Sequence, residues 1–194
     1  SALARVTGAT RVVKNGSGRA RALEGLPEET VMALGTAPEG PVPVPMNGAT
    51  YLADVMGGQK TGLFYDQRPN HAFARRLARG GRVLDVFAHV GGFGLAALAG
   101  GAAEAVLVDS SAAALALAEG GARAMGRQVA LRQGDAFAVM EALAAEGERF
   151  DLVVCDPPAF APSKAALDAG QRAYERVARL AAPLVREGGY LGLC

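Results

Sequence analysis

The stretch FDLVVCDPPAF, residues 150–160, is an apolar run that stops at an acid and two prolines. Its valines and leucine are typical of a buried strand. Proline cannot extend a hydrogen-bonded ladder, so Pro157 and Pro158 end the strand and leave Asp156 at its tip. Ligands of open α/β sheets bind beyond the carboxyl ends of the strands. The stretch therefore predicts such a sheet, with Asp156 at the edge of a binding site.

Three other acidic residues, Asp85, Asp109 and Asp135, each close an earlier strand-like run. The carboxyl ends of parallel strands meet at one edge of a sheet, so the four acids are expected to line that edge. A glycine loop follows the first of them. This combination indicates a nucleotide-like ligand on a doubly wound sheet.

The part of the chain from residue 69 to residue 194 alternates strands with helices. Helical connections between strands imply right-handed crossovers and parallel pairing. We therefore predict an α/β fold with a doubly wound, mostly parallel sheet. The expected strands are 82–87, 105–108, 129–132, 150–155 and 190–194, and the expected helices are 69–78, one opening at 93–98, 112–125, 137–145 and 170–185.

Residues 1–68 differ in composition, because glycine, proline and short extended runs dominate them. Turn signals such as Lys14-Asn15-Gly16 and Asn47-Gly48 separate these runs. We predict a small β-rich domain or linker of hairpins over residues 1–68, followed by the larger domain at 69–194. The runs are 11–14, 31–34, 42–44 and 50–55.

The composition of the 194 residues excludes several classes of protein. A formal net charge of +1 argues against a polybasic nucleic-acid binder. Two histidines and two cysteines without a CxxC motif argue against a metal site or a disulfide scaffold, and fit a reducing cytoplasm. No apolar run approaches the roughly 18 residues of a membrane span. We expect a cytoplasmic protein with no metal and no membrane contact.

The glycine loop lies within VLDVFAHVGGFGLAA, residues 83–97. Gly91, Gly92 and Gly94 allow a sharp turn and a close approach of the backbone to a ligand. The helix that follows offers free N–H groups to a carboxylate or phosphate. The loop also fits the dinucleotide pattern GxGxxA, with Asp109 placed for a ribose. Glycines used only for packing are the alternative.

Asp85 separates these possibilities, because it stands in the strand ahead of the glycines. Its carboxylate can reach the loop backbone and accept hydrogen bonds from an ammonium group, whereas it would repel a pyrophosphate. An amino-acid ligand suits it better, and S-adenosylmethionine adds an adenosine for Asp109 and Asp135. Each of these two acids also fits the role of a helix cap.

With these residues in view, the chain resembles class I S-adenosylmethionine-dependent methyltransferases. More narrowly, it is similar to the bacterial enzymes that methylate cytosine C5 of large-subunit ribosomal RNA, over nearly the whole chain from about Arg11. The most specific segment is GGQKTGLFYDQR, residues 57–68, which generic methyltransferases lack. The other matching segments are LEGL (23–26), DVFAHVGGFG (85–94), VDSS (108–111), GDAF (134–137) and DPPAF (156–160) with Ser163-Lys164.

The resemblance implies S-adenosylmethionine as the cofactor, a class I Rossmann-like fold, RNA as the partner, and a possible homodimer. It implies that Asp85 and the glycine loop hold the methionine end, Asp109 the ribose and Asp135 the adenine. Asp156 and Phe160 are the expected catalytic residues beside the target base. The expected cofactor contacts are Gln67, Asp85, Phe87, Gly91, Gly92, Gly94, Asp109, Ser110, Asp135, Ala136 and Asp156, and the expected RNA contacts are Lys60, Arg68 and Lys164. For residues 57–68, a structural bridge with solvated charges is the alternative.

Two departures from the family pattern are visible. Relatives carry an N-terminal RNA-binding domain of the PUA type, of which at most the last strand is expected here. They also carry a Ser-Cys-Ser motif whose cysteine attacks the base, and Cys194 aligns two residues before that cysteine. We therefore expect a chain truncated at both ends, lacking the last two strands of the sheet and the nucleophile beyond Cys194. Cys155 is expected to face the core.

The chemistry implied by the resemblance is covalent. A thiolate adds to cytosine C6, C5 then accepts a methyl group, and a base removes the C5 proton. The target base must leave its stack to reach the pocket. Asp156 is placed to bond N3 or the exocyclic amine, and Phe160 to stack on the base or to pack under its own loop.

Three other functions remain open from the sequence. A methyltransferase acting on an exocyclic amine of adenine or guanine also uses an acid or Asn before two prolines and an aromatic, although Ala159 intervenes here before Phe160. A nicotinamide dehydrogenase is disfavoured by Asp85 and by the Asp-Pro-Pro segment. A non-catalytic RNA-binding or assembly module is the third.

Overall fold

The computed structural model of the protein describes residues 2–16, 19–27, 29–57, 63–161 and 163–194. The chain divides into two compact units. The larger unit comprises residues 43–52 and 62–194, and the smaller comprises residues 1–42 and 53–61.

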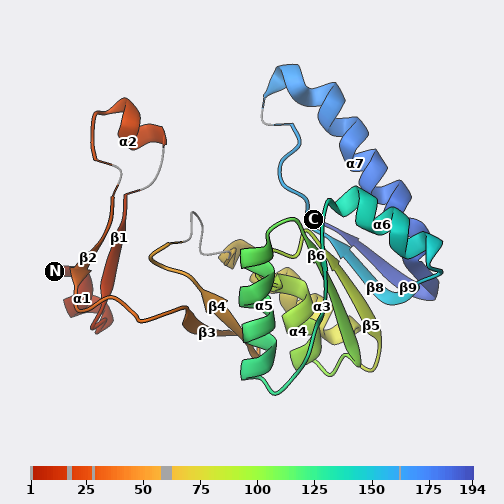
Figure 1. Ribbon diagram of the computed structural model, residues 1–194, viewed down its shortest axis with the longest axis horizontal. Helices are drawn as coiled ribbons and strands as arrows, with labels where there is room; N and C mark the ends of the chain where they lie inside the picture. Colours follow the sequence, from red (N-terminus) through yellow and green to blue (C-terminus); the bar gives the residue numbers. More distant parts are fainter. Residues whose placement is uncertain (1, 17–18, 28, 58–62, 162) are drawn as a thin grey trace. The chain divides into compact units, whose positions relative to one another are not determined.

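The larger unit is built on a five-stranded sheet whose strands are all parallel (Figure 1). The strand order is β7-β6-β5-β8-β9. The chain therefore moves outward from β5 to β7 and then crosses back to β8, so the order reverses between β5 and β8, which is where open sheets bind ligands. This confirms the predicted α/β, doubly wound fold. The strands are β5 (Arg82–Val86), β6 (Glu104–Asp109), β7 (Ala130–Gln133), β8 (Phe150–Cys155) and β9 (Val185–Leu193).

Helices cover both faces of this sheet, with α3, α4 and α5 on one face and α6 and α7 on the other (Figure 1). The expected helix 170–185 is wrong at its end, because α7 gives way to a short 3-10 turn, η3 (Ala182–Leu184), that contains Pro183. Proline disfavours helical geometry in the residue before it. No helix in the described parts of the chain is long and apolar enough to cross a bilayer. The helices are α3 (Arg68–Leu77), α4 (Gly92–Ala99), α5 (Ala112–Ala124), α6 (Ala136–Ala145) and α7 (Leu167–Ala181).

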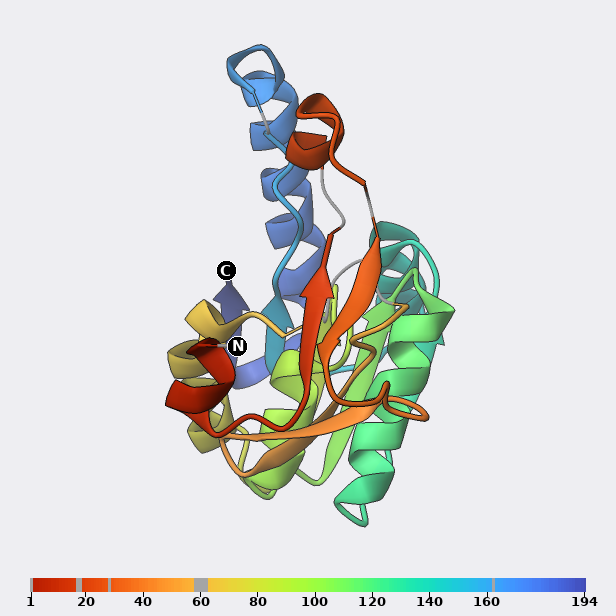
Figure 2. The same cartoon turned by 90° about the vertical axis from the view of Figure 1, so that its left-hand side faces the viewer.

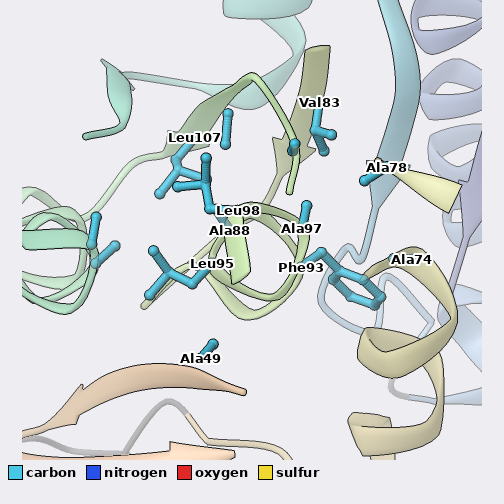
Figure 3. Close-up of a cluster of buried hydrophobic side chains, with 14 of the residues drawn as sticks. Ala49, Ala74, Ala78, Val83, Ala88, Phe93, Leu95, Ala97, Leu98 and Leu107 are labelled. Atoms are coloured by element: carbon cyan, nitrogen blue, oxygen red, sulfur yellow. The ribbon is translucent and has the colours of Figure 1, made fainter. Parts of the chain in front are cut away.

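The first of the two cores lies around α4 (Figure 3). Every residue from Phe93 to Leu98 is buried, which is typical of a helix packed on all sides. Leu95 and Leu98 meet Leu107 of the sheet, while Phe93 points toward Ala74 of α3 (Figure 3). The helix that follows the glycine loop is therefore fixed by packing along its length.

Residues 43–52 hold most of a β-hairpin, β3 (Val42–Met46) and β4 (Ala49–Ala53). Its turn is the predicted Asn47-Gly48, where both residues have positive φ, 54° and 78°, as a two-residue hairpin turn requires. Tyr51 is fully buried in the core around α4. These residues thus group with the sheet, whereas the sequence grouped them with the preceding residues. A domain boundary after residue 68 stays a prediction.

The smaller unit contains a second, antiparallel pair, β1 (Val12–Asn15) and β2 (Thr30–Leu34), which lie side by side in Figure 2. Extended runs were predicted at both places. The segment between them includes α2 (Arg19–Leu23), and α1 (Ala2–Thr7) precedes β1. Neither helix was predicted, because five or six residues carry too little hydrophobic periodicity to reveal a helix.

Candidate functional site

The four acids that follow the strands lie at one edge of the sheet, as the parallel order requires. Asp85 is the penultimate residue of β5, and Asp109 is the last residue of β6. Asp135 caps α6 directly after β7, and Asp156 follows β8. The Asp156 N–H donates to the carbonyl of Val86 at 3.2 Å, which ties the Asp-Pro-Pro segment to the end of β5.

Asp85 holds the start of α4 in place of an N-cap side chain. The N-cap is Gly91, which has no side chain to offer. Asp85 Oδ2 accepts hydrogen bonds from the N–H groups of Gly94 at 2.7 Å and Phe93 at 3.1 Å, and a negative charge at a helix N-terminus is favourable. These two N–H groups are therefore not free for a ligand, which corrects that part of the prediction.

The other oxygen of Asp85 is a buried acceptor without a partner among the described residues. Asp85 is only 1% exposed. Its pKa is raised to about 7, mainly by burial, with smaller contributions from the charges of Asp156 and Asp109, while the hydrogen bonds from Gly94 and Phe93 oppose the rise. A buried acceptor left unsatisfied costs free energy, and a ligand ammonium would remove that cost. Asp85 Oδ1 is thus the strongest sign of a cationic ligand.

The loop between β5 and α4 is held in an unusual backbone conformation. Phe87 and His89 have positive φ values of 64° and 47°, which non-glycine residues rarely adopt outside constrained sites. Asp109 helps to hold them, because its Oδ2 accepts from the His89 N–H at 2.8 Å. The Ala88 N–H also donates to the carbonyl of Val108 at 3.0 Å. The loop is therefore preformed around the end of β6.

Asp109 uses both oxygens for backbone contacts, since Oδ1 also accepts from the Ser111 N–H at 2.8 Å. Each carboxylate oxygen has a second lone pair, so Asp109 can still accept bonds from two ribose hydroxyls. Ser111 rather than Ser110 caps α5, with its hydroxyl accepting from Ala114 at 3.2 Å. The side chain of Ser110 is exposed and its contact with a cofactor stays a prediction.

Asp135 has the capping role that the sequence left open. Its Oδ1 accepts from the Ala138 N–H at 3.0 Å. The residue is exposed, so its second oxygen can meet an exocyclic amine while the cap stays intact. The neighbouring Ala136 is buried at the start of α6.

An aromatic cluster stands beside these acids. The ring of Phe160 lies 5.0 Å from Tyr174, between centroids, and about 6 Å from Phe87 and Phe137. The hydroxyl of Tyr174 also accepts from the Phe160 N–H at 3.3 Å. Phe160 is thus fixed by packing in the Asp-Pro-Pro segment, and its stacking on a base stays a prediction. Tyr174 was missed, because it is remote in sequence and has no motif.

The specific segment at residues 57–68 is described only in part, and Lys60 lies outside the described residues. The segment ends in a 3-10 turn, η1 (Tyr65–Gln67). Gln67 Oε1 accepts from Asn70 at 2.6 Å. Burial raises the pKa of Asp156, and the negative charge of Asp66 adds to the rise, so η1 acts electrostatically on the site.

The two other predicted RNA contacts lie on different elements of the larger unit. Arg68 is exposed at the start of α3, and Lys164 is exposed at the start of η2 (Lys164–Ala166). Both side chains are therefore free to meet a phosphate.

Two buried residues contact the glycine loop and were not predicted from the sequence. The hydroxyl of Tyr51 donates to the carbonyl of Gly92 at 2.9 Å. His71 is 5% exposed, with its ring 4.5 Å from that of Phe93. Burial lowers the pKa of His71 to about 4, against an opposing effect of Asp66, so the ring is neutral near pH 7. Neither residue belongs to a motif that would have revealed it.

Tyr51→Phe tests the contribution of this support. The variant leaves the Gly92 carbonyl without its partner, so we expect the free energy of unfolding to fall by about 1–2 kcal/mol. We also expect cofactor affinity to drop several-fold as the loop loosens. Urea denaturation and calorimetry measure the two effects, with Tyr190→Phe, an exposed tyrosine, as the control. Equal behaviour of the two variants would show that the contact is dispensable.

The two cysteines differ in their surroundings. Cys155 is fully buried, as predicted, and burial raises the pKa of its thiol to about 12, with added effects of Asp85 and Cys194. Cys194 is exposed, and its N–H donates to the carbonyl of Cys155 at 3.1 Å. Although the residue is exposed as a whole, partial desolvation of its thiol and the charges of Asp156 and Asp85 raise the pKa of Cys194. Neither environment favours the thiolate that a nucleophile requires.

Comparison with known proteins places these features in context. A family model described as S-adenosylmethionine-dependent methyltransferase matches residues 15–194. Proteins named ribosomal RNA large subunit methyltransferase I, from Aeromonas salmonicida and Aeromonas hydrophila, are 40% and 41% identical over 88% of this chain. The chain spans 44% of the length of each of these curated relatives.

Solved structures show the same fold. A putative methyltransferase complexed with SAH has a TM-score of 0.72 and 25% identity, over 84% of this chain and 43% of that one. A SAM-dependent methyltransferase from Agrobacterium tumefaciens has a TM-score of 0.75 and 19% identity, over 97% of this chain and 60% of that one. The second likeness supports the fold alone.

Proposed function

Because the chain belongs to the S-adenosylmethionine-dependent methyltransferase family, we propose that it carries the cofactor-binding half of an RNA methyltransferase. The proposed target is cytosine C5 of large-subunit ribosomal RNA. The relatives named as large-subunit ribosomal RNA methyltransferases support an RNA substrate. The choice of C5 rests on the specific segment at residues 57–68 and on the residues of the Asp-Pro-Pro segment.

The residues present fit the cofactor. Asp85 Oδ1, buried and without a partner in the described chain, would accept from the ammonium of the methionine end. Asp109 would accept from the ribose hydroxyls, and the free oxygen of Asp135 from the adenine amine. Gly91 takes the left-handed conformation, with φ 82°, that brings the loop close to a ligand. The single observation that carries this assignment is the half-satisfied carboxylate of Asp85.

When bound, S-adenosylmethionine supplies an electrophilic methyl group. We propose that Asp156 holds the target base, because it is half-buried beside the carboxyl ends of β5 and β8. Burial raises the pKa of Asp156, so a proton on its carboxyl group costs less than on an exposed aspartate, and the protonated form would donate to cytosine N3. The ionised form would accept from the exocyclic amine instead. The fixed ring of Phe160 would form one wall for the base.

C5 of cytosine needs a nucleophile at C6 before it can accept a methyl group. The attacking sulfur forms a bond to C6, and the same bond breaks when a base removes the C5 proton. Cys155 and Cys194 both have raised thiol pKa values. We therefore propose that the attacking thiol belongs to neither and lies elsewhere in the protein that contains this chain.

Calorimetry with S-adenosylmethionine, S-adenosylhomocysteine and NAD tests the cofactor. We expect the first two to bind and NAD not to bind, because a pyrophosphate next to Asp85 is repelled. Binding of NAD alone would overturn the assignment.

A ribosomal RNA fragment in which 5-fluorocytosine replaces cytosine tests the reaction. Fluorine cannot leave as a proton does, so we expect the full-length gene product to become covalently attached to this RNA in the presence of the cofactor. The variants Cys155→Ser and Cys194→Ser should keep the adduct, which a shifted band on a denaturing gel reports. Methyl transfer to an exocyclic amine without any adduct would replace C5 by the alternative reaction.

A further inference from the structure

We propose that the arginine face formed by Arg68, Arg75 and Arg76 of α3 and by Arg79 of the turn after it binds the phosphate backbone of the RNA that flanks the target base. This inference rests on the proposed RNA substrate and adds a surface that lies outside the cofactor site.

The local charge is strongly one-sided. Residues 68–79 contain four arginines and no acidic residue. The helix α3 itself contains three arginines and no acid. This stretch therefore presents positive charge to solvent although the whole chain is close to neutral.

The arginines follow one side of the helix. The residue seven positions after Arg68 returns to nearly the same angle at 100° per residue, so Arg68 and Arg75 lie on one side of α3. Arg79 follows in the turn after the helix, and the three residues form a stripe. His71 and Ala74 are the residues of α3 that are buried, on a different side of the helix. Arg76 lies next to the stripe, with its guanidinium over the ring of Phe73 at 5.4 Å.

The lower part of the stripe opens onto a hollow of about 540 Å³. Three arginines and the end of α4 line it: Arg75, Arg76, Arg79, Ala99, Gly100 and Gly101. Gly100 lets α4 pack closely on α3, since a Cβ there would collide with the carbonyl oxygen of Arg75. All three arginines line the hollow and are exposed, so an anion can enter it from solvent.

Arg75, Arg76 and Arg79 belong to the arginines of the larger unit without an ion pair in the described chain, a group that also includes Arg68, Arg127, Arg149, Arg172 and Arg179. Five other arginines of the same unit each pair with an acid: Arg82, Arg123, Arg132, Arg176 and Arg186. Three like charges around one hollow repel one another, and an anion relieves that repulsion.

The stripe begins near the candidate site. Arg68 directly follows η1, whose Asp66 acts electrostatically on Asp156, and α3 then runs toward the opposite edge of the sheet, where β5 begins. The ten residues of α3 cover about 15 Å. A nucleic-acid strand presents a phosphate about every 3.4 Å along a duplex axis, so the stripe can meet several successive phosphates. A base in the site and its neighbouring backbone on α3 fit one continuous strand.

The variant Arg75→Gln/Arg76→Gln/Arg79→Gln tests this surface. The matched control is Arg123→Gln/Arg132→Gln/Arg176→Gln, which removes the same charge from exposed but ion-paired arginines. RNA affinity is measured by fluorescence anisotropy over a range of KCl concentrations, and S-adenosylhomocysteine affinity by calorimetry. Melting temperatures show whether each variant is folded.

We expect the α3 variant to weaken RNA binding about tenfold to 100-fold near 100 mM KCl. The slope of log affinity against log salt should fall by about 2, at about 0.7 for each lost phosphate contact on a single strand. S-adenosylhomocysteine affinity should not change, and the control should change the slope by less than half as much. The triple lysine variant at the same three positions should keep the slope, because its charge is retained.

Several outcomes would overturn the proposal. An α3 variant whose RNA slope equals that of the control shows that the backbone lies elsewhere. Inorganic phosphate could raise the melting temperature of the wild type but not of the α3 variant, while the RNA slope of the two proteins is the same. That result would assign the hollow to a small phosphate ligand instead. If the wild-type protein binds S-adenosylhomocysteine but no RNA, both this proposal and the RNA substrate of the proposed function are wrong. This result differs from failure of the present proposal alone, in which the wild type binds RNA and the α3 variant behaves like the control.

Discussion

Asp85→Asn is expected to keep the fold and to lower the affinity for S-adenosylmethionine by about 100-fold. The asparagine oxygen can still accept from the N–H groups of Phe93 and Gly94, which Asp85 binds now. The ammonium of the cofactor loses its carboxylate partner, and a hydrogen bond to a charged group is worth about 1.5–3 kcal/mol, where about 1.4 kcal/mol is a factor of ten. Calorimetry measures the loss, and Asp168→Asn, an exposed acid of α7, is the control.

The same substitution should change how stability depends on pH. Asp85 has a pKa of about 7 when folded, against about 3.9 when unfolded, so the folded state binds its proton more tightly. The stabilisation of the folded state by protonated Asp85 is therefore fully present below about pH 4. The free energy of unfolding then falls by about 1.4 kcal/mol per pH unit as the pH rises toward 7. We expect the melting temperature of the wild type to fall across this range relative to Asp85→Asn. Parallel curves for the two proteins would contradict the buried, weakly acidic state of Asp85.

Gly94→Ala is expected to destabilise the protein by about 1–3 kcal/mol, the usual cost of overpacking a core, and to abolish measurable cofactor binding. A Cβ at this position would collide with Leu107 Cδ2 and lie 3.4 Å from Asp85 Oδ2. Leu107 is fully buried in β6 of the central sheet, so the start of α4 must move away from the sheet, which disturbs the hydrogen bonds from Phe93 and Gly94 to Asp85. Urea denaturation and calorimetry record the two effects.

Gly192→Ala is the matched control for this substitution. Its Cβ would have only ordinary contacts, the nearest at 3.7 Å to Val154, in the same sheet. We expect it to change the unfolding free energy by less than about 1 kcal/mol and to leave cofactor binding intact. If Gly94→Ala behaved like Gly192→Ala, the close approach of α4 to the sheet would not be what forms the site.

The parts that could be predicted from the sequence depend on local patterns. The strand 150–155 was predicted with its observed bounds, because an apolar run followed by two prolines leaves little freedom. The acids at the strand ends were found for the same reason, since each follows a run with clear strand character. The Asn47-Gly48 turn was readable because few other residues accept positive φ at both positions.

The features that were missed depend on contacts between distant parts of the chain. Tyr51 and Gly92 are 41 residues apart in sequence, and no motif links them. The left-handed conformations of Phe87 and His89 are imposed by the ends of neighbouring strands, whereas their side chains predict ordinary backbone geometry. Similarly, one carboxylate oxygen of Asp85 is hydrogen-bonded and the other has no partner in the described chain, and this difference follows from the packing of α4.

The most direct test of the account is a crystal structure of the protein with S-adenosylhomocysteine. We predict that the ligand ammonium lies within hydrogen-bonding distance of Asp85 Oδ1, with the ribose at Asp109. A ligand whose ammonium lies away from Asp85, or an adenosine placed outside the carboxyl edge of β5 and β6, would contradict the central claim.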